Sequence, residues 1–259
     1  MIKLSSSGLT APKVSPTAYP ADGVAVVIGA SGGIGAALLA QLARDPRFAR
    51  VLALSRTAVA ADDLRIVWAA IDVTNESSIA AAAALAQRLG KVRLVIVASG
   101  LLHGDGVRPE KHWGALKGET MAQVFAVNSI GPALVAKHFL PLLPREGRSV
   151  FAAISARVGS IEDNRLGGWY AYRASKAALN MLLKNFAIEL VRRAPAAVCI
   201  GLHPGTVDTP LSVPFQDNVA PGNLFTPAES AAHLLRVIDQ ISPADSGRVF
   251  AWDGSLVPA

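Results

Sequence analysis

The sequence predicts an α/β fold with a single doubly wound parallel sheet of about seven strands, flanked by helices. Three observations lead to this class. Short β-branched apolar runs alternate with helically spaced apolar residues along most of the chain, which is typical of repeated βαβ units. Some runs, 94–97 above all, are continuously apolar, as in strands buried on both faces of a parallel sheet. Hydrophobic residues make up 51% of the 259 residues, which is enough for one large core.

Residues 1–22 differ from the rest of the chain. They contain a run of serines and several prolines without an apolar period, so we expect an irregular N-terminal extension and then one domain over 23–259. The opening residues lack the apolar core of a signal peptide, and no apolar run approaches the roughly 18 residues that span a bilayer. These features predict a cytoplasmic protein that does not bind membranes.

The first predicted strand, 24–28, leads directly into a glycine-rich turn. Glycines there allow the backbone to bend sharply and let a phosphate approach where a Cβ would block it. The apolar residues that follow recur at helical spacing, so the helix N-terminus would face the phosphate. A second apolar strand, 51–54, completes a Rossmann-type βαβ unit for a dinucleotide. The residues expected to hold the cofactor in this turn are Gly29, Ser31, Gly33, Ile34 and Gly35.

The rest of the chain continues the alternation. Asn75 is a suitable N-cap for an alanine-rich helix, and Thr226 before Pro227 marks the start of another. The breakers Pro141 and Pro144 end a long helix between these two. The further predicted strands are 65–70, 94–97, 149–154, 197–202 and 248–252, and the further predicted helices are 76–89, 119–143, 170–193 and 227–240. The irregular loops 101–117 and 211–225 are expected to line a substrate pocket.

Tyr172 and Lys176 stand four residues apart in a predicted helix, so their side chains share one face. A nearby ammonium group stabilises a phenolate and lowers the pKa of tyrosine, which lets the phenol exchange a proton with a substrate oxygen near neutral pH. Proton transfer of this kind accompanies the reduction of a carbonyl group by a nicotinamide cofactor. Together with the glycine turn, the pair predicts an oxidoreductase.

Five motifs follow one another between residues 24 and 252. They are Gly29-x-x-x-Gly33-x-Gly35, Asp72-Val73, Asn128, Tyr172-Arg-Ala-Ser-Lys176 and Pro204-Gly205-x-x-x-Thr209. In this order they resemble the motifs of a classical short-chain dehydrogenase/reductase. The stretches 157–164 and 167–180 further resemble the C-factor-like branch of that family.

The resemblance implies a role for each of these residues. Tyr172 would be the general acid/base, Lys176 would lower its pKa and hold the nicotinamide ribose hydroxyls, and Asn128 would hold a water that relays protons to Lys176. Asp72 and Val73 would lie near the adenine. The other implied cofactor contacts are Ala98, Ser99 and Gly100, where the family commonly has Asn-Ala-Gly, and Pro204, Gly205, Val207 and Thr209.

One departure from the family pattern concerns catalysis. The family's catalytic serine normally stands three residues before the glycine that is Gly159 here, and that position holds Ala156. The adjacent Ser155 is expected to orient the substrate if the strand end bends, because neighbouring side chains of a regular strand face opposite ways. Ser160 is a second candidate for this role.

The end of the second strand bears on the choice of cofactor. NAD-selective sites carry an acidic residue about 20 residues after the glycines, whereas this chain has Ser55-Arg56 there. Ser55 and Arg56 are therefore expected to contact the cofactor. Arg56 is suited to pair with a 2′-phosphate, which predicts a preference for NADP(H) over NAD(H). The alternative is a solvated arginine without a ligand.

Other features are assigned no special function. The net charge of +6 comes from scattered basic residues, so nucleic-acid binding is not expected. The histidines lack the spacing of metal ligands, so no metal site is predicted. The single cysteine, Cys199, lies in an apolar run and is expected to be buried, and Met121 and Met181 are expected in the core.

These observations predict an NADP(H)-dependent oxidoreductase that acts on a small carbonyl or alcohol substrate. The alternative is a non-catalytic, cofactor-binding signalling protein of the C-factor type, which Ala156 favours. Both alternatives include cofactor binding, so only turnover separates them. The resemblance also implies a homodimer or homotetramer built on helices 119–143 and 170–193.

Overall fold

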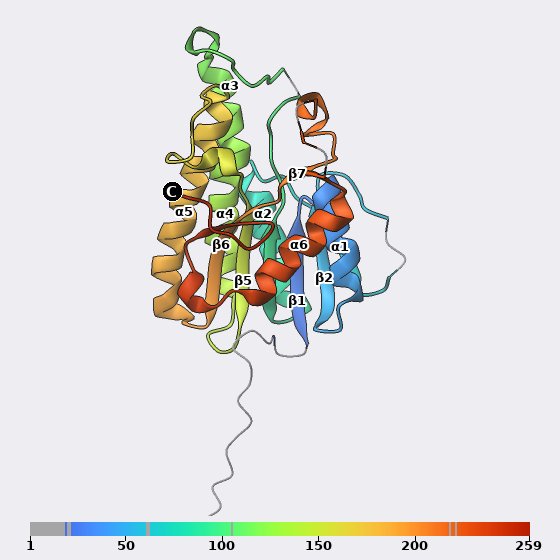
Figure 1. Cartoon of the computed structure of the whole chain (residues 1–259). Coiled ribbons are helices and arrows are strands. Elements are labelled where there is room, and N and C mark those ends of the chain that lie inside the picture. Colours follow the sequence, from blue (N-terminus) through green and yellow to red (C-terminus); the bar gives the residue numbers. More distant parts are fainter. Residues whose placement is uncertain (1–18, 20–21, 61–62, 105, 218, 221) are drawn as a thin grey trace, which may run out of the picture.

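The computed structural model describes residues 19, 22–60, 63–104, 106–217, 219–220 and 222–259, so the extension expected over 1–22 lies almost wholly outside the described residues. Its centre is a seven-stranded parallel sheet with the strand order β3-β2-β1-β4-β5-β6-β9 (Figure 1). The strands are β1 (Gly23–Ile28), β2 (Phe48–Ser55), β3 (Ile66–Ala70), β4 (Val92–Val97), β5 (Ser149–Ile154), β6 (Ala197–His203) and β9 (Val249–Ala251). The predicted fold class is confirmed.

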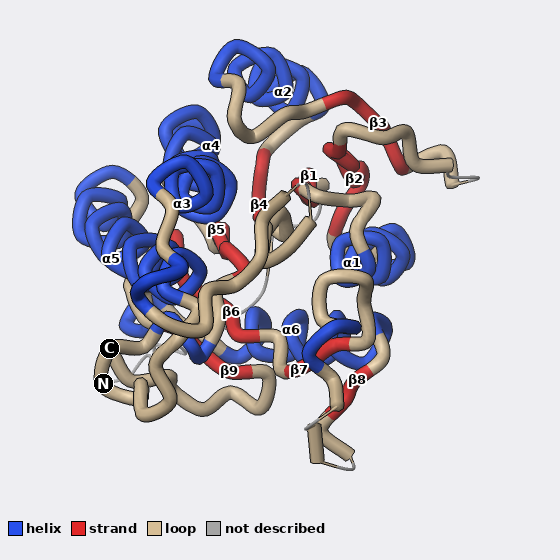
Figure 2. The backbone as a smooth tube through the Cα atoms, turned by 90° about the horizontal axis from the view of Figure 1, so that it is seen from above, coloured by secondary structure: helices blue, strands red, loops and turns tan. Residues whose placement is uncertain are grey.

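Helices cover both faces of the sheet, as Figure 2 shows from above. On one face lie α2 (Glu76–Leu89), α4 (Gly131–Phe139) and α5 (Tyr170–Arg193). On the other lie α1 (Gly33–Arg44) and α6 (Pro227–Gln240). This arrangement creates two apolar cores, one on each side of the sheet.

The alternation of side chains along β1 shows how the two cores arise. Val24, Val26 and Ile28 belong to the core beneath α2, α4 and α5, whereas Ala25 and Val27 belong to the core beneath α1 and α6. All six residues of β1 are fully buried. A strand that is buried on both faces needs apolar residues at every position, which explains its continuous apolar run.

The helix predicted over 119–143 is confirmed, but it is not a uniform α-helix. It consists of α3 (Gly118–Phe125), a π-helical turn (Ala126–Ile130), α4 and a 3-10 turn (Leu140–Leu142). Pro132 has no N–H to donate to the carbonyl oxygen of Asn128, four residues earlier, and the Gly131 N–H bonds to Ala126 instead. The missing bond accounts for the wider turn, which contains Asn128.

One core assignment from the sequence is wrong. The Met181 side chain is 63% exposed, because α5 turns Leu179, Leu183 and Ala187 toward the sheet and Met181 lies on the opposite side of the helix. Cys199 is fully buried in β6, as expected.

Two short additions complete the fold. The two-residue strands β7 (Thr206–Val207) and β8 (Leu224–Phe225) pair with each other and hold the ends of the segment 208–223 together. None of the helices in the described ranges has the length and apolar character needed to cross a membrane.

Candidate functional site

The residues singled out from the sequence gather at one edge of the sheet. All seven strands run parallel, so their carboxyl ends meet along a single edge, the side from which Figure 2 is viewed. The backbone joins the first of these ends directly, since the Gly29 N–H bonds to Leu54 O at 2.8 Å and the Ala98 N–H bonds to Ile28 O at 2.7 Å. The ends of β2, β1 and β4 are therefore held side by side.

The turn after β1 fits a dinucleotide phosphate. Gly29 has φ +86°, and a Cβ added there would lie 2.8 Å from the Ser99 nitrogen, so only glycine is accommodated. Helix α1 begins at Gly33 without a side-chain cap and without an acidic residue in its first turn. Its N-terminal N–H groups thus present a positive end toward an anion. The Thr209 side chain packs against the start of α1, because a Cβ added to Gly33 would lie 2.5 Å from Thr209 Cγ2.

The ends of β2 and β3 supply polar groups beside this turn. The buried Ser55 hydroxyl donates to Thr57 O at 2.7 Å and accepts from Trp68 Nε1 at 3.2 Å, so its hydrogen bonds are already made. Arg56, the next residue, is exposed. Asp72 accepts hydrogen bonds from the Thr74 hydroxyl and N–H, which hold the pKa of its carboxyl below the usual value, and the charge of Arg56 lowers it further.

The segment after β4 contains a buried polar atom without a partner. The Ser99 hydroxyl is inaccessible and makes no hydrogen bond within the described structure. A buried hydroxyl in this state is costly unless a ligand or a water completes it. Its position between the glycine turn and the end of β4 is consistent with a bound cofactor, to which Ala98 and Gly100 are adjacent.

Asn128 is held rigidly by its amide group. Its Oδ1 accepts from the Leu101 N–H at 2.8 Å, and its Nδ2 donates to Leu101 O at 2.8 Å and to Ser175 Oγ at 3.1 Å. The side chain is fully buried. These bonds join the π-helical turn to the segment after β4 and to α5, so Asn128 connects the expected cofactor side of the site with the helix that carries Tyr172.

The structure brings Tyr172 and Lys176 together on α5. The Lys176 Nζ lies 5.7 Å from the centre of the Tyr172 ring and donates to Ile154 O, at the end of β5, at 2.8 Å. The pKa of the Tyr172 phenol is not lowered by Lys176, in contrast to the sequence prediction, because burial raises it to about 12 in the cofactor-free protein. Burial also lowers the pKa of the Lys176 ammonium to about 8. Tyr172 is therefore protonated at neutral pH and is able to donate a proton to a substrate oxygen.

Neither candidate serine bonds to Tyr172 in the structure. The Ser155 hydroxyl is buried and donates to Asn180 Oδ1 at 2.6 Å, two turns along α5 from Tyr172. The Ser160 hydroxyl donates to Ala259 O at 3.1 Å and accepts from the Asp163 N–H at 3.0 Å. For either serine, orientation of a substrate stays a prediction that requires exchange of an existing hydrogen bond.

The residues after β6 form the far side of the site. Pro204 O accepts from the buried Ser230 hydroxyl at 3.0 Å, which anchors the turn on α6. Gly205 has φ +78°, and a Cβ there would lie 2.6 Å from the Phe225 ring. Val207 is buried in β7 beside Phe225 of β8.

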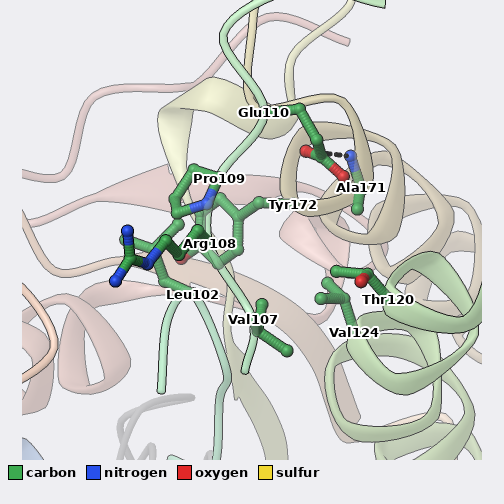
Figure 3. Close-up of a pocket in the computed structure, with 9 residues that line it drawn as sticks. All are labelled: Leu102, Val107, Arg108, Pro109, Glu110, Thr120, Val124, Ala171 and Tyr172. Atoms are coloured by element: carbon green, nitrogen blue, oxygen red, sulfur yellow. Dashed lines mark hydrogen bonds between the residues drawn. The ribbon is translucent and has the colours of Figure 1, made fainter. Parts of the chain in front are cut away.

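The sequence analysis missed Glu110, which lies beside Tyr172 (Figure 3). Its side chain is only 5% exposed, Oε2 accepts from the Ala171 N–H at 3.2 Å, and Oε1 has no partner within the described structure. Its carbonyl oxygen also accepts from the Trp169 N–H at 2.5 Å. Helix α5 has no side-chain N-cap of its own, so Glu110 serves as the cap from a distant loop. No local signal reveals this, because Glu110 is 61 residues from Ala171.

A narrow crevice with both apolar and polar lining residues adjoins this contact. Its lining joins the loop after β4 to α3 and to the start of α5, as Figure 3 shows. The residues that line it are Leu102, Val107, Arg108, Pro109, Glu110, Thr120, Val124, Ala171 and Tyr172. The predicted loop 101–117 thus reaches Tyr172.

Comparison with known proteins supports the same conclusion. Residues 23–220 match the family described as short chain dehydrogenase. The chain is 35% identical over 190 residues to the 1-hydroxy-2-glutathionyl-2-methyl-3-butene dehydrogenase of Rhodococcus sp. (strain AD45), across 72% of this chain and 77% of that protein. It is 39% identical over 138 residues to the C-signal protein of Myxococcus xanthus, across 53% of this chain and 78% of that protein.

Solved structures share the whole fold. The NADPH-bound carbonyl reductase from chicken fatty liver superposes with a TM-score of 0.80 at 26% identity, over 96% of this chain and 100% of that chain. The carbonyl reductase Sniffer of D. melanogaster superposes with a TM-score of 0.78 at 22% identity, over 92% and 100% of the two chains. With the glycine turn, Asn128, Tyr172 and Lys176 at one sheet edge, this protein belongs to the short-chain dehydrogenases and is an oxidoreductase of the C-factor-like branch.

Proposed function

We propose that this protein is an NADPH-dependent carbonyl reductase, or an alcohol dehydrogenase in the reverse direction, with Tyr172 as general acid/base. The observation that carries the proposal is the Tyr172–Lys176 pair on α5, with Nζ 5.7 Å from the ring centre, beside the buried Asn128 amide. The NADPH-bound carbonyl reductase that shares the fold supports it. We place the activity in the cytoplasm, as the sequence predicts.

The chain's own residues would divide the work as follows. The nicotinamide, when bound, supplies or accepts a hydride at the carbonyl carbon. Tyr172 donates the proton to the carbonyl oxygen in reduction and accepts it in oxidation. The Lys176 ammonium stabilises the resulting tyrosinate, and Asn128 holds the water that returns a proton to Lys176. The predicted orienting hydroxyl is Ser155, which would exchange its bond to Asn180 for one to the substrate.

The cofactor would lie along the carboxyl edge of the sheet. Its phosphates would contact the turn Gly29–Gly35 and Thr209, and its adenine would lie against Asp72 and Val73. The remaining proposed contacts are Ala98, Ser99, Gly100, Pro204, Gly205 and Val207. The preference for NADPH rests on Arg56, which is exposed at the end of β2 where an NAD-selective site carries an acid.

Calorimetric titration with NADPH and NADH at one ionic strength tests the cofactor assignment. We expect Arg56→Ala to weaken NADPH binding about ten- to a hundredfold, because a charge-assisted hydrogen bond to the 2′-phosphate is lost, and to leave NADH binding unchanged. Arg44→Ala removes an exposed arginine at the end of α1 and is the matched control. Equal losses for the two cofactors would refute the role of Arg56.

A second candidate function is a cofactor-binding signalling protein without turnover. Two observations favour it: Ala156 in the position of the family's serine, and the 39% identity to the C-signal protein. A screen of carbonyl substrates with NADPH separates the two functions. Turnover that is lost in Tyr172→Phe supports the reductase, whereas tight NADPH binding without any turnover supports the signalling protein.

A further inference from the structure

Three aromatic rings from separate segments lie in series beside Tyr172. The Trp169 ring centre is 6.2 Å from that of Tyr172 and 4.8 Å from that of Phe215, and Phe215 is 5.6 Å from His103. Their interplanar angles of 76°, 61° and 70° are edge-to-face arrangements. We refer to His103, Trp169 and Phe215 as the aromatic cluster.

The backbone places these rings. Trp169 has φ +51°, a left-handed conformation that a non-glycine residue rarely adopts, and its N–H bonds to Glu110 O at 2.5 Å. A residue held in this region beside a functional site indicates that its position matters more than its conformational cost. The position of the Trp169 ring next to the proton donor is thus built into the start of α5.

Phe215 and His103 are joined across the two loops expected to line the substrate pocket. The His103 Nε2 lies 3.0 Å from Pro210 O and 3.1 Å from Leu211 O. Both neighbours are acceptors, so Nε2 carries the proton and donates to them. This contact holds the segment that carries Phe215 against the loop after β4.

The chemistry of the cluster favours one kind of substrate. The half-buried Trp169 ring is centred 6.2 Å from the Tyr172 ring, so a substrate that bonds to the Tyr172 hydroxyl would lie close to it, with Phe215 behind. Ring faces and ring edges carry opposite partial charges, so a planar aromatic group gains more from such neighbours than a saturated group of equal size. We propose that the aromatic cluster selects carbonyl substrates that carry an aromatic ring near the carbonyl group. This inference rests on the proposed carbonyl reductase function.

A pair of matched aldehydes tests the inference. Phenylacetaldehyde and cyclohexylacetaldehyde have the same carbon skeleton, and in both a methylene group separates the ring from the carbonyl. We expect a higher kcat/KM with NADPH for the phenyl compound. Phe215→Leu and Trp169→Leu should reduce the ratio of the two kcat/KM values about three- to tenfold, the range expected for one aromatic contact.

The control variants distinguish loss of an aromatic ring from a general disturbance of the fold. Phe215→Tyr keeps the ring and should keep the ratio. Leu166→Ala removes a 91% exposed side chain from the segment before Trp169 and should leave the ratio unchanged. Reduction of both aldehydes with equal kcat/KM, or a ratio that survives both leucine variants, would overturn the inference and leave the proposed function standing.

A binding measurement covers the case without turnover. Calorimetric titration of the protein with 2-phenylethanol and 2-cyclohexylethanol, in the presence of NADP⁺, reports the same preference. If neither aldehyde nor any other carbonyl compound is reduced, the proposed function fails. Tighter binding of the phenyl alcohol that is lost in Phe215→Leu would still support the aromatic preference, and equal binding of the two alcohols would overturn it.

Discussion

At the scale of single residues, Lys176 shows the conflict between stability and function. Its side chain is 2% exposed, and its ammonium group donates to the Ile154 carbonyl oxygen. Burial lowers its pKa from 10.5 to about 8, so the folded protein disfavours the charged form that catalysis is proposed to use. A group placed at such cost is typical of an active site.

Lys176→Met is therefore expected to stabilise the cofactor-free protein while abolishing turnover. The lowered pKa means that burial of the charged lysine destabilises the folded protein by about 3 kcal/mol at neutral pH. The variant also loses the hydrogen bond to Ile154, which reduces the expected stabilisation by about 1 kcal/mol. The net gain of about 2 kcal/mol should raise Tm by roughly 5 °C.

The pH dependence of this gain follows from the sign of the shift. Because the folded pKa lies below the unfolded one, the wild-type protein bears the full cost below about pH 8 and loses it as the pH rises to 10.5. Chemical denaturation at several pH values measures this. A difference between variant and wild type that does not change with pH would contradict the assignment.

Ala156 is the residue that separates this chain from the family pattern. Ser155 already bonds to Asn180, so a hydroxyl at 156 would supply a donor without breaking that contact. We expect Ala156→Ser to raise kcat/KM for a carbonyl substrate about tenfold, because a positioned donor stabilises developing negative charge. Ala156→Cys, similar in size but a weak donor, should stay near the parental value.

The same assay examines Ser155 itself. If it orients the substrate, Ser155→Ala should lower kcat/KM about tenfold. If turnover stays at the parental value while the unfolding temperature falls, Ser155 has only a structural role, through its hydrogen bond to Asn180.

At the scale of elements, the start of α5 determines where the proton donor lies. The helix begins after Trp169, which has a left-handed backbone conformation, and its N-terminal cap is Glu110. A carboxylate at this position also interacts favourably with the positive end of the helix dipole. Tyr172 is the residue after the capped Ala171. Glu110 is thus a positioning residue, which acts on Tyr172 through the first turn of the helix.

Removal of this cap should affect both stability and turnover. We expect Glu110→Ala to cost about 1–2 kcal/mol of unfolding free energy and to lower kcat, with little change in the dissociation constant of NADPH. Glu110→Gln keeps an acceptor oxygen and should recover most of kcat. An alanine variant that unfolds earlier but turns over at the parental kcat would show that the cap is structural only.

At the scale of the whole molecule, the outer faces of the π-helical turn and α5 carry apolar side chains. Ile130 is 53% exposed, Met181 63% and Ile188 51%. The helices concerned are those through which the family resemblance implies a homodimer or homotetramer. These exposed side chains give that expectation a specific location.

Light scattering after size-exclusion chromatography tests the assembly. We expect an oligomer in the wild-type protein and a shift to monomer in Met181→Glu, because a buried, unpaired carboxylate is unfavourable at an apolar interface. Leu64→Glu alters a side chain that is 94% exposed between β2 and β3 and should leave the oligomeric state unchanged. A monomeric wild-type protein would contradict this prediction.

The sequence by itself determined the parallel sheet, the glycine turn and the Tyr172–Lys176 face of α5. Each of these depends on residues close together in the chain, whose spacing sets strand burial, turn conformation or helix face. Helices α2 and α6 begin directly after Asn75 and Thr226, the caps that the sequence predicts. The shared sheet edge then follows, because parallel strands bring all their carboxyl ends together.

Only the tertiary structure decided the finer parts of the site. The Glu110 cap, the bond between Ser155 and Asn180 and the aromatic cluster join segments that are distant in the sequence. The exposure of Met181 depends on which face of α5 meets the sheet. Contacts of this kind arise from how whole elements pack, and the neighbours of a residue in the chain carry no information about them.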